Sequence, residues 1–308
     1  MHKLIKFYLV LFIFLFVSTG HSKSEINDEF KLWLKNFKQE AIKKGISKET
    51  VEVVFKDAKY LAKVIKYDRR QPEFIELTEV YVNKRATKSR AKRAKALYLQ
   101  HEELFNEIEK NFFVEKELLL ALWGIETNFG KYVGKMDIVS SLATLSFDKR
   151  RSAFFSKELL ILLNLVDKKI VNVETLFGSW AGAMGNFQFM PSTIKVYAID
   201  YDKNGKIELK TSTKDSAASA ANYIHKMGWK ENSYCYIEVK TTKEIKEKLI
   251  NFSAKKISNK LSIKKWKRLG IELPINLNIE PNTKAALISP DGKNSPKFLV
   301  FHNYGKVL

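Results

Sequence analysis

The stretch ALWGIETNFG, from Ala121 to Gly130, places one carboxylate near the end of an apolar helical run. Apolar side chains point in nearly every direction around this run, which predicts a helix from about Val114 to Asn128 that is buried on most sides. Glu126 must therefore either reach the surface or be partly desolvated. Desolvation raises the pKa of a carboxyl group and suits it to act as a general acid near neutral pH. The spacing alone favours the simpler interpretation, an exposed glutamate near a helix end.

The composition is that of a globular protein with a strong positive charge. The 308 residues are 45% hydrophobic and 29% charged, and 54 basic against 34 acidic residues give a formal net charge of +20. Such an excess attracts polyanions, but the lysines are spread along the chain, which favours a solvated basic surface. No arginine-rich run or zinc-finger spacing indicates a nucleic-acid partner. The single cysteine, Cys235, leaves no internal disulfide and is expected to pack as a small hydrophobic side chain.

The N-terminus has the layout of a secretory signal. Lys3 and Lys6 precede an apolar run from Phe7 to Val17, and small residues follow at 18–20. The run is shorter than the roughly 20 residues of a spanning helix, and no cysteine nearby could accept a lipid. We predict residues 1–22 as a signal peptide that directs export from the cytoplasm, with an uncleaved signal that anchors the protein to the inner membrane as the alternative.

The remainder predicts a mainly α protein of the α+β class. Apolar periodicity indicates two helices within 30–62, separated at Gly45, with Ser47 as the cap of the second. Pro72 breaks helicity, and one long helical pattern covers 78–111. Further helices are expected over 153–166, 191–197 and 216–227, a glycine-rich loop after Gly178, and short strands around 236–239, 286–288 and 298–301. We therefore predict a helical domain over 23–232 and a small mixed or β subdomain over 233–308.

Five segments, in order along the chain, carry a family resemblance. They are DRRQPEF (Asp68–Phe74), ALWGIETNFG (Ala121–Gly130), LATLSFDKRRSAFF (Leu142–Phe155), GSWAGAMGNFQFMPS (Gly178–Ser192) and AANYIHKMGW (Ala220–Trp229). With these segments the sequence resembles the family B lytic murein transglycosylases, glycoside hydrolase family 103. One such segment would be a weak signal, whereas five at compatible spacing are specific.

The resemblance implies a lysozyme-like helical body and a reaction. Enzymes of this family cleave the β-1,4 bond between N-acetylmuramic acid and N-acetylglucosamine in peptidoglycan without water, and leave a 1,6-anhydro end. Glu126 matches the family's catalytic glutamate, which would act first as acid and then as base. The substrate's own N-acetyl group could stabilise the reacting centre, so no second carboxylate is needed. The alternatives are a muramidase that hydrolyses the same bond and a catalytically weakened peptidoglycan-binding protein.

The resemblance also implies a set of substrate-binding residues. These are Ser179, Gln188, Phe189, Met190, Arg150, Arg151 and Phe154. Ser179 would hydrogen-bond near Glu126 and the muramyl acetamide, and the two arginines could hold a carboxylate of the peptide stem or the lactyl group. Phe154 stands where some members have tyrosine, so that stacking would remain without the hydroxyl. Core packing is the alternative for Phe189 and Met190, and surface charge for the arginines.

A second candidate site lies in DYDKNGKIELKTSTKD, from Asp200 to Asp215. Asp200, Asp202 and Asn204 alternate as oxygen ligands, Gly205 makes a sharp turn, and Lys206 could offer its carbonyl, as at the start of an EF-hand loop. Position twelve is Thr211 instead of glutamate. Some members of the family bind a cation in the equivalent loop, with a later aspartate closing it, which here is Asp215. The expectation is a structural calcium or sodium ion, a plain polar turn being the alternative; no cofactor is required for catalysis.

The resemblance further implies partners and a location. The expected partner is the glycan strand of peptidoglycan, and the expected location is the periplasm. The protein is expected to be a monomer. It could also associate peripherally with the membrane or with the cell-wall synthesis machinery. In the family, a segment similar to Phe298–Phe301 is followed by a Tyr-Asn pair and by a final helix that lines the cleft. The sequence given stops at Leu308, so the subdomain is expected to be truncated and to lack that helix.

Overall fold

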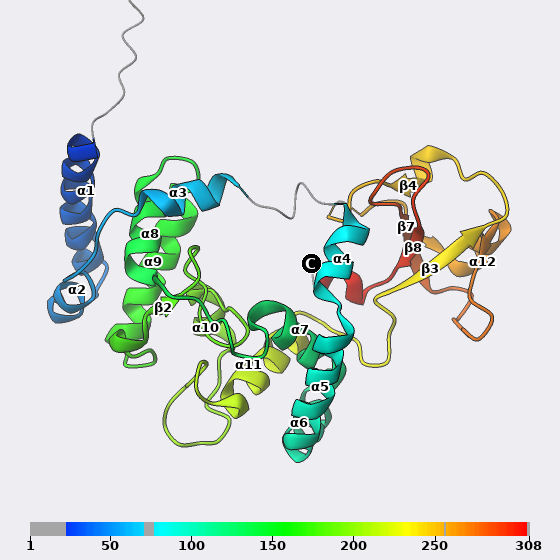
Figure 1. Ribbon diagram of the computed structural model, residues 1–308, viewed down its shortest axis with the longest axis horizontal. Helices are drawn as coiled ribbons and strands as arrows, with labels where there is room; N and C mark the ends of the chain where they lie inside the picture. Colours follow the sequence, from blue (N-terminus) through cyan, green and yellow to red (C-terminus); the bar gives the residue numbers. More distant parts are fainter. Residues whose placement is uncertain (1–22, 71–76, 256, 307–308) are drawn as a thin grey trace, which may run out of the picture.

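The computed structural model describes residues 23–70, 77–255 and 257–306 of the chain. Figure 1 shows a mainly helical body and, beside it, a smaller part that contains most of the strands. The predicted signal peptide and the predicted break at Pro72 lie outside the described residues. Within the described residues, no helix has both the length and the apolar character needed to cross a membrane.

Of the twelve α-helices in the described residues, eleven belong to the body. They are α1 (Lys23–Lys43), α2 (Lys48–Val54), α3 (Ala62–Arg69), α4 (Thr78–Arg85), α5 (Lys88–Gln100), α6 (Glu102–Phe112), α7 (Lys116–Thr127), α8 (Ile138–Phe147), α9 (Ser152–Asp167), α10 (Pro191–Tyr197) and α11 (Thr213–Lys226). Two short strands, β1 (Met136–Asp137) and β2 (Phe177–Gly178), pair antiparallel inside it. The predicted turn between the first two helices is confirmed: Gly45 has φ +89°, and the Ser47 hydroxyl accepts the Thr50 N–H at 3.2 Å as the cap of α2.

The single long helix predicted over 78–111 is wrong, because the chain folds there into α4, α5 and α6. Thr87 lies between α4 and α5, and its hydroxyl accepts the backbone N–H of Arg90 at 3.2 Å. His101, with φ −125°, separates α5 from α6. A side-chain cap thus starts a new helix where no glycine or proline marks the boundary.

The helix α8 lies at the centre of the body and was not predicted as a helix. Nine of its ten residues are buried, and it packs against α9 (Figure 1). Two of its buried hydroxyls hold the preceding segment: Ser140 Oγ accepts the N–H of Lys59 at 3.0 Å, and Thr144 Oγ1 accepts that of Leu61 at 2.9 Å. These bonds fix the segment that leads into α3.

The C-terminal part is built on a sheet. Its elements are β3 (Tyr236–Thr241), β4 (Ile250–Asn251), β5 (Leu261–Ser262), α12 (Ile263–Arg268), β6 (Ile271–Glu272), β7 (Lys284–Ile288) and β8 (Lys297–Val300). The order is β4-β7-β8-β3-β6, with β5 paired to β7. The predicted strands are confirmed, since Val300 pairs with both Tyr236 and Ala286. The fully buried Trp266 of α12 donates from Nε1 to the Ala285 carbonyl at 2.8 Å and closes a separate core.

Side-chain hydrogen bonds fix the segment that leads from the helical body to the sheet. The Glu115 carboxylate accepts the Trp229 Nε1–H at 2.6 Å and the Asn232 N–H at 2.9 Å. The half-buried Cys235 lies close by, and burial together with the charge of Glu115 raises the pKa of its thiol to about 11. The thiol therefore stays protonated and unreactive, as expected for a packing residue.

The sheet subdomain also caps a helix of the body. Asp291, in the turn between β7 and β8, accepts the backbone N–H of Thr78 at 2.8 Å and that of Glu79 at 3.4 Å, the first two residues of α4. Burial works to raise the pKa of Asp291, but these hydrogen bonds outweigh it and hold the pKa below its usual value. The start of α4 is thus fixed by a residue more than two hundred positions later in the chain.

Candidate active site

Glu126 lies in the last turn of α7. The buried face of this helix carries Leu119, Leu120 and Trp123, whereas Ile125 is 50% exposed and Glu126 itself is exposed. The predicted burial on most sides is therefore wrong for the side of the helix that carries Ile125. The exposed carboxyl is nevertheless partly desolvated by the protein around it, and this desolvation alone raises the pKa of Glu126.

Asn186 fixes the end of the glutamate helix. Its side-chain oxygen accepts the Trp123 Nε1–H at 3.2 Å, and its carbonyl accepts the Thr127 hydroxyl at 2.8 Å. Its backbone N–H donates to the Leu209 carbonyl at 2.8 Å and its Nδ2 to the Lys210 carbonyl at 3.2 Å. This 4% exposed residue thus connects α7 to the loop before α11.

Ser179 lies in a tight turn directly after β2. Its Oγ accepts the backbone N–H groups of Ala181 at 3.3 Å and Ala183 at 3.0 Å, so its own proton remains to be donated. A Cβ at the preceding Gly178 would lie 2.1 Å from the Ala183 carbonyl oxygen, so only glycine fits there. The turn orients the Ser179 hydroxyl, and its predicted bond toward Glu126 stays a prediction.

Gln188 is half-buried in the same glycine-rich loop. Its backbone has φ +50°, a left-handed conformation that non-glycine residues seldom adopt. Its Nε2 donates to the carbonyls of Val133 at 3.2 Å and Gly185 at 2.9 Å. The side-chain oxygen of Gln188 is the end that these bonds leave to accept a hydrogen bond, as a predicted contact with a sugar requires.

Phe189 and Met190 lie at the end of the loop. Phe189 is 7% exposed and packs in the core against Phe187 and Tyr223, at ring-centre distances of 6.4 and 6.1 Å. This placement favours the alternative, core packing, over the predicted contact with a sugar ring. Met190 is half-buried and forms the N-cap position of α10.

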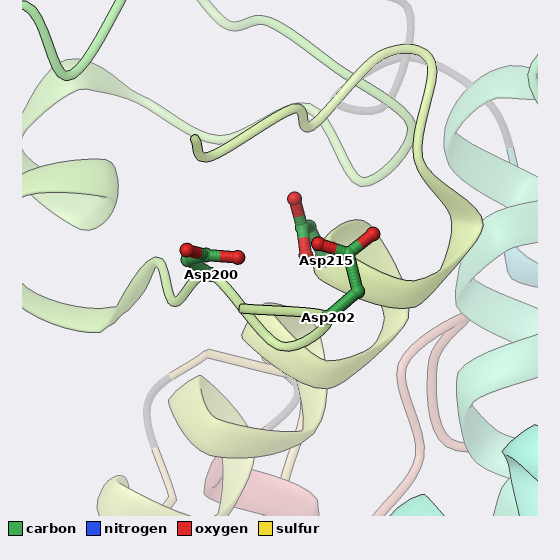
Figure 2. A group of neighbouring side chains, drawn as sticks. All are labelled: Asp200, Asp202 and Asp215. Atoms are coloured by element: carbon green, nitrogen blue, oxygen red, sulfur yellow. The ribbon is translucent and has the colours of Figure 1, made fainter. Parts of the chain in front are cut away.

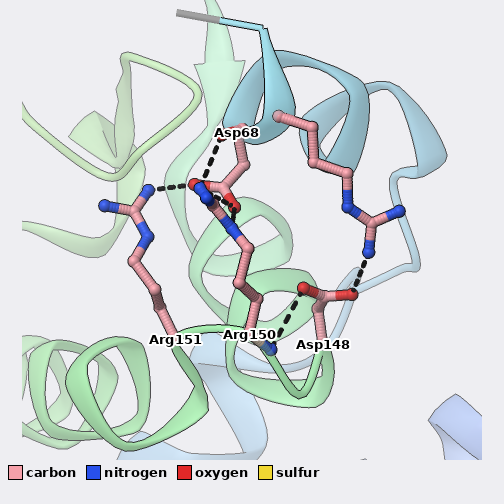
Figure 3. A network of polar contacts seen from close by, with 5 residues as sticks. Asp68, Asp148, Arg150 and Arg151 are labelled. Atoms are coloured by element: carbon pink, nitrogen blue, oxygen red, sulfur yellow. Dashed lines mark hydrogen bonds and ion pairs between the residues drawn. The ribbon is translucent and has the colours of Figure 1, made fainter.

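Arg150 and Arg151 converge on one buried carboxylate (Figure 3). Arg150 donates from Nε to Asp68 Oδ2 at 2.7 Å and from Nη2 to the Asp68 carbonyl at 2.6 Å. Arg151 donates from Nη2 to Asp68 Oδ1. Asp68 is 2% exposed, so the anion that the two arginines hold is part of the protein. The bonds to Asp68 give the two arginines a structural role, and their predicted contact with a substrate carboxylate stays a prediction.

Asp148 and Phe154 flank the two arginines in the sequence, and they differ in their surroundings. Asp148 forms a salt bridge with Arg69 Nη2 at 2.9 Å (Figure 3). Phe154 is 48% exposed and meets Phe155 edge to face at 5.0 Å between ring centres. The exposed Phe154 ring is available for the stacking predicted for it.

The loop before α11 and the first turn of α11 bring three carboxylates together (Figure 2). Oxygen atoms of Asp200, Asp202 and Asp215 all lie within 4.8 Å of one another. Gly205 has φ +86°, the sharp turn expected from the sequence, and Asp200 accepts its N–H at 2.7 Å. Asp215 thus lies beside the loop as a carboxylate, where an EF-hand loop would have a glutamate at position twelve and this chain has Thr211.

The chemistry of this cluster fits a hard cation. Asp215 is fully buried, and its two oxygens accept the N–H groups of Tyr201 at 2.9 Å and Glu208 at 3.0 Å. No lysine or arginine in the described ranges forms an ion pair with the three aspartates. The side-chain oxygen of Asn204 accepts the backbone N–H of Lys206 at 2.9 Å, so this oxygen already has one hydrogen bond within the loop. Three close carboxylates with oxygen donors suit calcium.

Comparison with known proteins assigns this arrangement to a family. Residues 29–308 match the transglycosylase SLT domain. The chain belongs to this family.

Individual relatives agree with the assignment. The chain is 40% identical over 131 residues to membrane-bound lytic murein transglycosylase B of Escherichia coli, a match that covers 42% of the chain and 36% of that enzyme. The crystal structure of SltB3 from Pseudomonas aeruginosa in complex with NAG-NAM-pentapeptide has a TM-score of 0.82 and 31% identity, over 90% of this chain and 74% of that one. The Escherichia coli lytic transglycosylase SLT35 in complex with calcium has a TM-score of 0.75 and 25% identity, over 93% and 88%.

Three polar residues of this transglycosylase domain had no role predicted from the sequence. Asp68 anchors two arginines, Asn186 fixes the glutamate helix, and Glu158, 2% exposed, accepts the Ser192 N–H at 2.8 Å at the start of α10. Glu158 stands in the apolar run of α9 much as Glu126 stands in that of α7. The same pattern of one acid among apolar residues thus yields a cap in one helix and an exposed, desolvated acid in the other.

Proposed function

We propose that this protein is a lytic transglycosylase that cleaves the β-1,4 bond between N-acetylmuramic acid and N-acetylglucosamine in peptidoglycan, with Glu126 as its acid and base. The match of residues 29–308 to the transglycosylase SLT domain carries the proposal. The raised pKa of Glu126 agrees with it, because a general acid must hold its proton close to the working pH. The family membership and the relatives, one of them bound to a peptidoglycan fragment, supply the substrate.

The reaction needs one proton carrier in two roles. Protonated Glu126 gives its proton to the glycosidic oxygen as the bond to the muramyl C1 breaks. The carboxylate then removes the proton from the muramyl 6-hydroxyl, whose oxygen bonds to C1 and closes the 1,6-anhydro ring. The acid is regenerated and no water is consumed. Ser179, Gln188 and Phe154 are proposed to orient the sugar through a hydroxyl proton, an amide oxygen and an aromatic face.

The positions of the other acids favour this route over hydrolysis. A hydrolytic enzyme of the ordinary retaining or inverting kind needs a second carboxylate for the water or the intermediate. Asp137 caps α8 through the Ser140 N–H, Asp148 pairs with Arg69, and Glu158 caps α10. Each of these three candidates is thus engaged in holding the fold.

Digestion of purified sacculi, with mass spectrometry of the released muropeptides, tests the proposal. We expect 1,6-anhydro ends from the natural protein and a loss of about 10³-fold in rate for Glu126→Gln, which keeps the shape but cannot transfer the proton. Glu103→Gln, a change of the same kind at an exposed position of α6, is the control and should keep its 1,6-anhydro products. Reducing ends would show a hydrolase instead, and turnover unchanged by Glu126→Gln would refute the assigned acid.

We further infer that Asp200, Asp202 and Asp215 hold a structural calcium or sodium ion, with the Asn204 side chain and the Lys206 carbonyl as further oxygen ligands. The 4.8 Å cluster and the calcium complex of the relative SLT35 support this. Calcium at a hundred times its Kd should stabilise the protein by about 2.7 kcal/mol. The melting temperature should rise in calcium relative to a chelator, and Asp202→Asn should diminish the rise; equal melting temperatures would exclude the site.

We also propose that residues 1–22 direct export to the periplasm. Two lysines followed by the apolar run from Phe7 to Val17 support this. Cell fractionation and N-terminal sequencing of the mature protein test the proposal: a new N-terminus near Ser22 is expected from cleavage, and an intact N-terminus in the membrane fraction would indicate the uncleaved anchor.

A further inference from the structure

The side chain of Asn186 lies between the glutamate helix and the segment that leads into α11. Its Oδ1 accepts the indole N–H of Trp123 at 3.2 Å, and its Nδ2 donates to the Lys210 carbonyl at 3.2 Å and to the Ser216 hydroxyl at 3.3 Å. An indole N–H can only donate and a backbone carbonyl can only accept, so these two partners determine which end of the amide faces which element. The amide thus joins two elements that are far apart in the sequence.

The bonds to Asn186 lie on both sides of Glu126 in the last turn of α7. Trp123 precedes the acid by one helical turn. Thr127 follows it directly and donates its hydroxyl to the Asn186 carbonyl at 2.8 Å. The last carbonyls of a helix have no partner within the helix, so the final turn depends on outside contacts for a fixed position. Asn186 supplies two such contacts, one before and one after the acid.

The Glu126 carboxyl has no polar support of its own. Within the described residues, no hydrogen bond or ion pair holds it, and desolvation is the one cause of its raised pKa. The place of the carboxyl is therefore set by the backbone of the last turn of α7 and by the packing around that turn. A residue that fixes this turn also fixes the acid.

Asn186 belongs to the glycine-rich loop that carries two of the proposed sugar contacts, Ser179 and Gln188. The loop and the end of α7 fit closely, since a Cβ at Gly130 would lie 2.6 Å from Asn186 Oδ1. Asn186 is 4% exposed, so a sugar cannot reach its side chain. Its amide therefore connects the acid to the groups that orient the sugar without itself touching the substrate.

We propose that Asn186 is a positioning residue of the reaction, whose amide holds the Glu126 carboxyl at a fixed place relative to Ser179 and Gln188. The inference rests on the proposed function and adds a residue to it. A proton reaches the glycosidic oxygen only when the acid lies within hydrogen-bond reach, and a displacement of about 1 Å costs about 10²-fold in rate. Because Asn186 acts through Glu126, its loss should lower kcat and leave KM unchanged.

The test removes the amide and keeps its branched shape. Asn186→Leu abolishes the hydrogen bonds of the side chain, and Asn251→Leu is the matched control. Asn251 is 7% exposed, and its Nδ2 donates to the carbonyls of Ser258 at 3.1 Å and Leu287 at 2.9 Å. It is thus also a buried amide that joins separate segments, but it lies in the sheet subdomain.

The two variants are compared on soluble glycan strands released from sacculi. We expect Asn186→Leu to lower kcat about a hundredfold, with KM within about twofold of the natural value. Asn251→Leu should leave both constants at their natural values.

A second measurement separates positioning from a general weakening of the fold. Asn186→Leu is combined with Glu126→Gln, which has already lost the proton transfer. A residue that acts through the Glu126 carboxyl has nothing left to position in this background, so no further fall in rate is expected. A loss of about a hundredfold in both backgrounds would show a merely structural role and overturn the proposal.

Thr127→Val keeps the proposal testable where Asn186→Leu does not fold, as urea unfolding shows. It removes the hydroxyl that donates to Asn186 at nearly constant size, and should lower kcat about tenfold with KM unchanged. A natural kcat in the folded variant, or an equal fall of kcat in Asn251→Leu, would overturn the proposal. Absence of 1,6-anhydro products from the natural protein would instead count against the proposed function.

Discussion

Two carboxylates of the helical body, Glu126 and Asp68, are held in opposite ways. Asp68 is 2% exposed, and two guanidinium groups neutralise it. Glu126 is exposed, yet desolvation raises its pKa, and no cation in the described residues forms an ion pair with it. The more exposed of the two is therefore the one suited to exchange a proton, because counter-charge, more than depth, separates a structural carboxylate from a reactive one.

The largest effect is expected from removing the neutralised charge. Asp68→Asn leaves Arg150 and Arg151 without their counter-charge and should lower the free energy of unfolding by about 3 kcal/mol, as when one partner of a buried pair is lost. Asp148→Asn removes a carboxylate whose partner Arg69 is 58% exposed in its side chain, so a loss below about 1 kcal/mol is expected. Urea unfolding of both variants measures the difference. Equal losses would show that Asp68 is not the anchor described here.

A smaller effect is expected from admitting water beside the reactive carboxylate. Leu122 lies one helical turn before Glu126 and is half-buried. Leu122→Ser should relieve the desolvation and lower the raised pKa of Glu126, so that less of the acid is protonated at neutral pH. The fall of kcat/KM with rising pH should then begin at lower pH, with a several-fold loss at pH 7. A profile that keeps its position would mean that Leu122 does not contribute to the desolvation.

The smallest effect concerns stability at the reactive site. Because the folded-state pKa of Glu126 is raised, the native protein binds more protons than the unfolded chain between the two pKa values, so its stability falls as pH rises through this window. Glu126→Gln removes this dependence. The variant should unfold at slightly higher urea than the natural protein at pH 8, and at the same urea concentration below the ordinary pKa of glutamate. A variant less stable at pH 8 would contradict the desolvation of Glu126.

Local patterns in the sequence predicted much of this arrangement. The helix of Glu126, the stop at Gly45 with the cap at Ser47, and the strands around Ala286 all depend on neighbours in the chain, so that spacing and turn residues suffice. The break at Thr87 was missed because a helix cap inside a basic run gives no signal of its own, and the break at His101 was missed because no glycine, proline or side-chain cap marks it. The helix α8 was missed because IVSSLATLSF is buried all round and lacks an amphipathic period.

Contacts between distant segments could not be predicted in this way. The five-segment resemblance singled out Arg150 and Arg151, but their partner Asp68 lies 82 and 83 residues away. Only the fold shows that the arginines already hold an anion. The same holds for Asp215, which closes the cluster with Asp200 only because α11 folds back onto the loop.

The cap that Asp291 places on α4 determines when this helix can fold. The helix has eight residues, none of them buried, and helices of this length do not persist in water without such support. During synthesis Thr78 emerges long before Asp291, so α4 lacks this cap until the turn between β7 and β8 has formed. A protease cut in the turn at Asp291 would therefore loosen α4, which lies far from the cut in the sequence, and leave α7 with Glu126 intact.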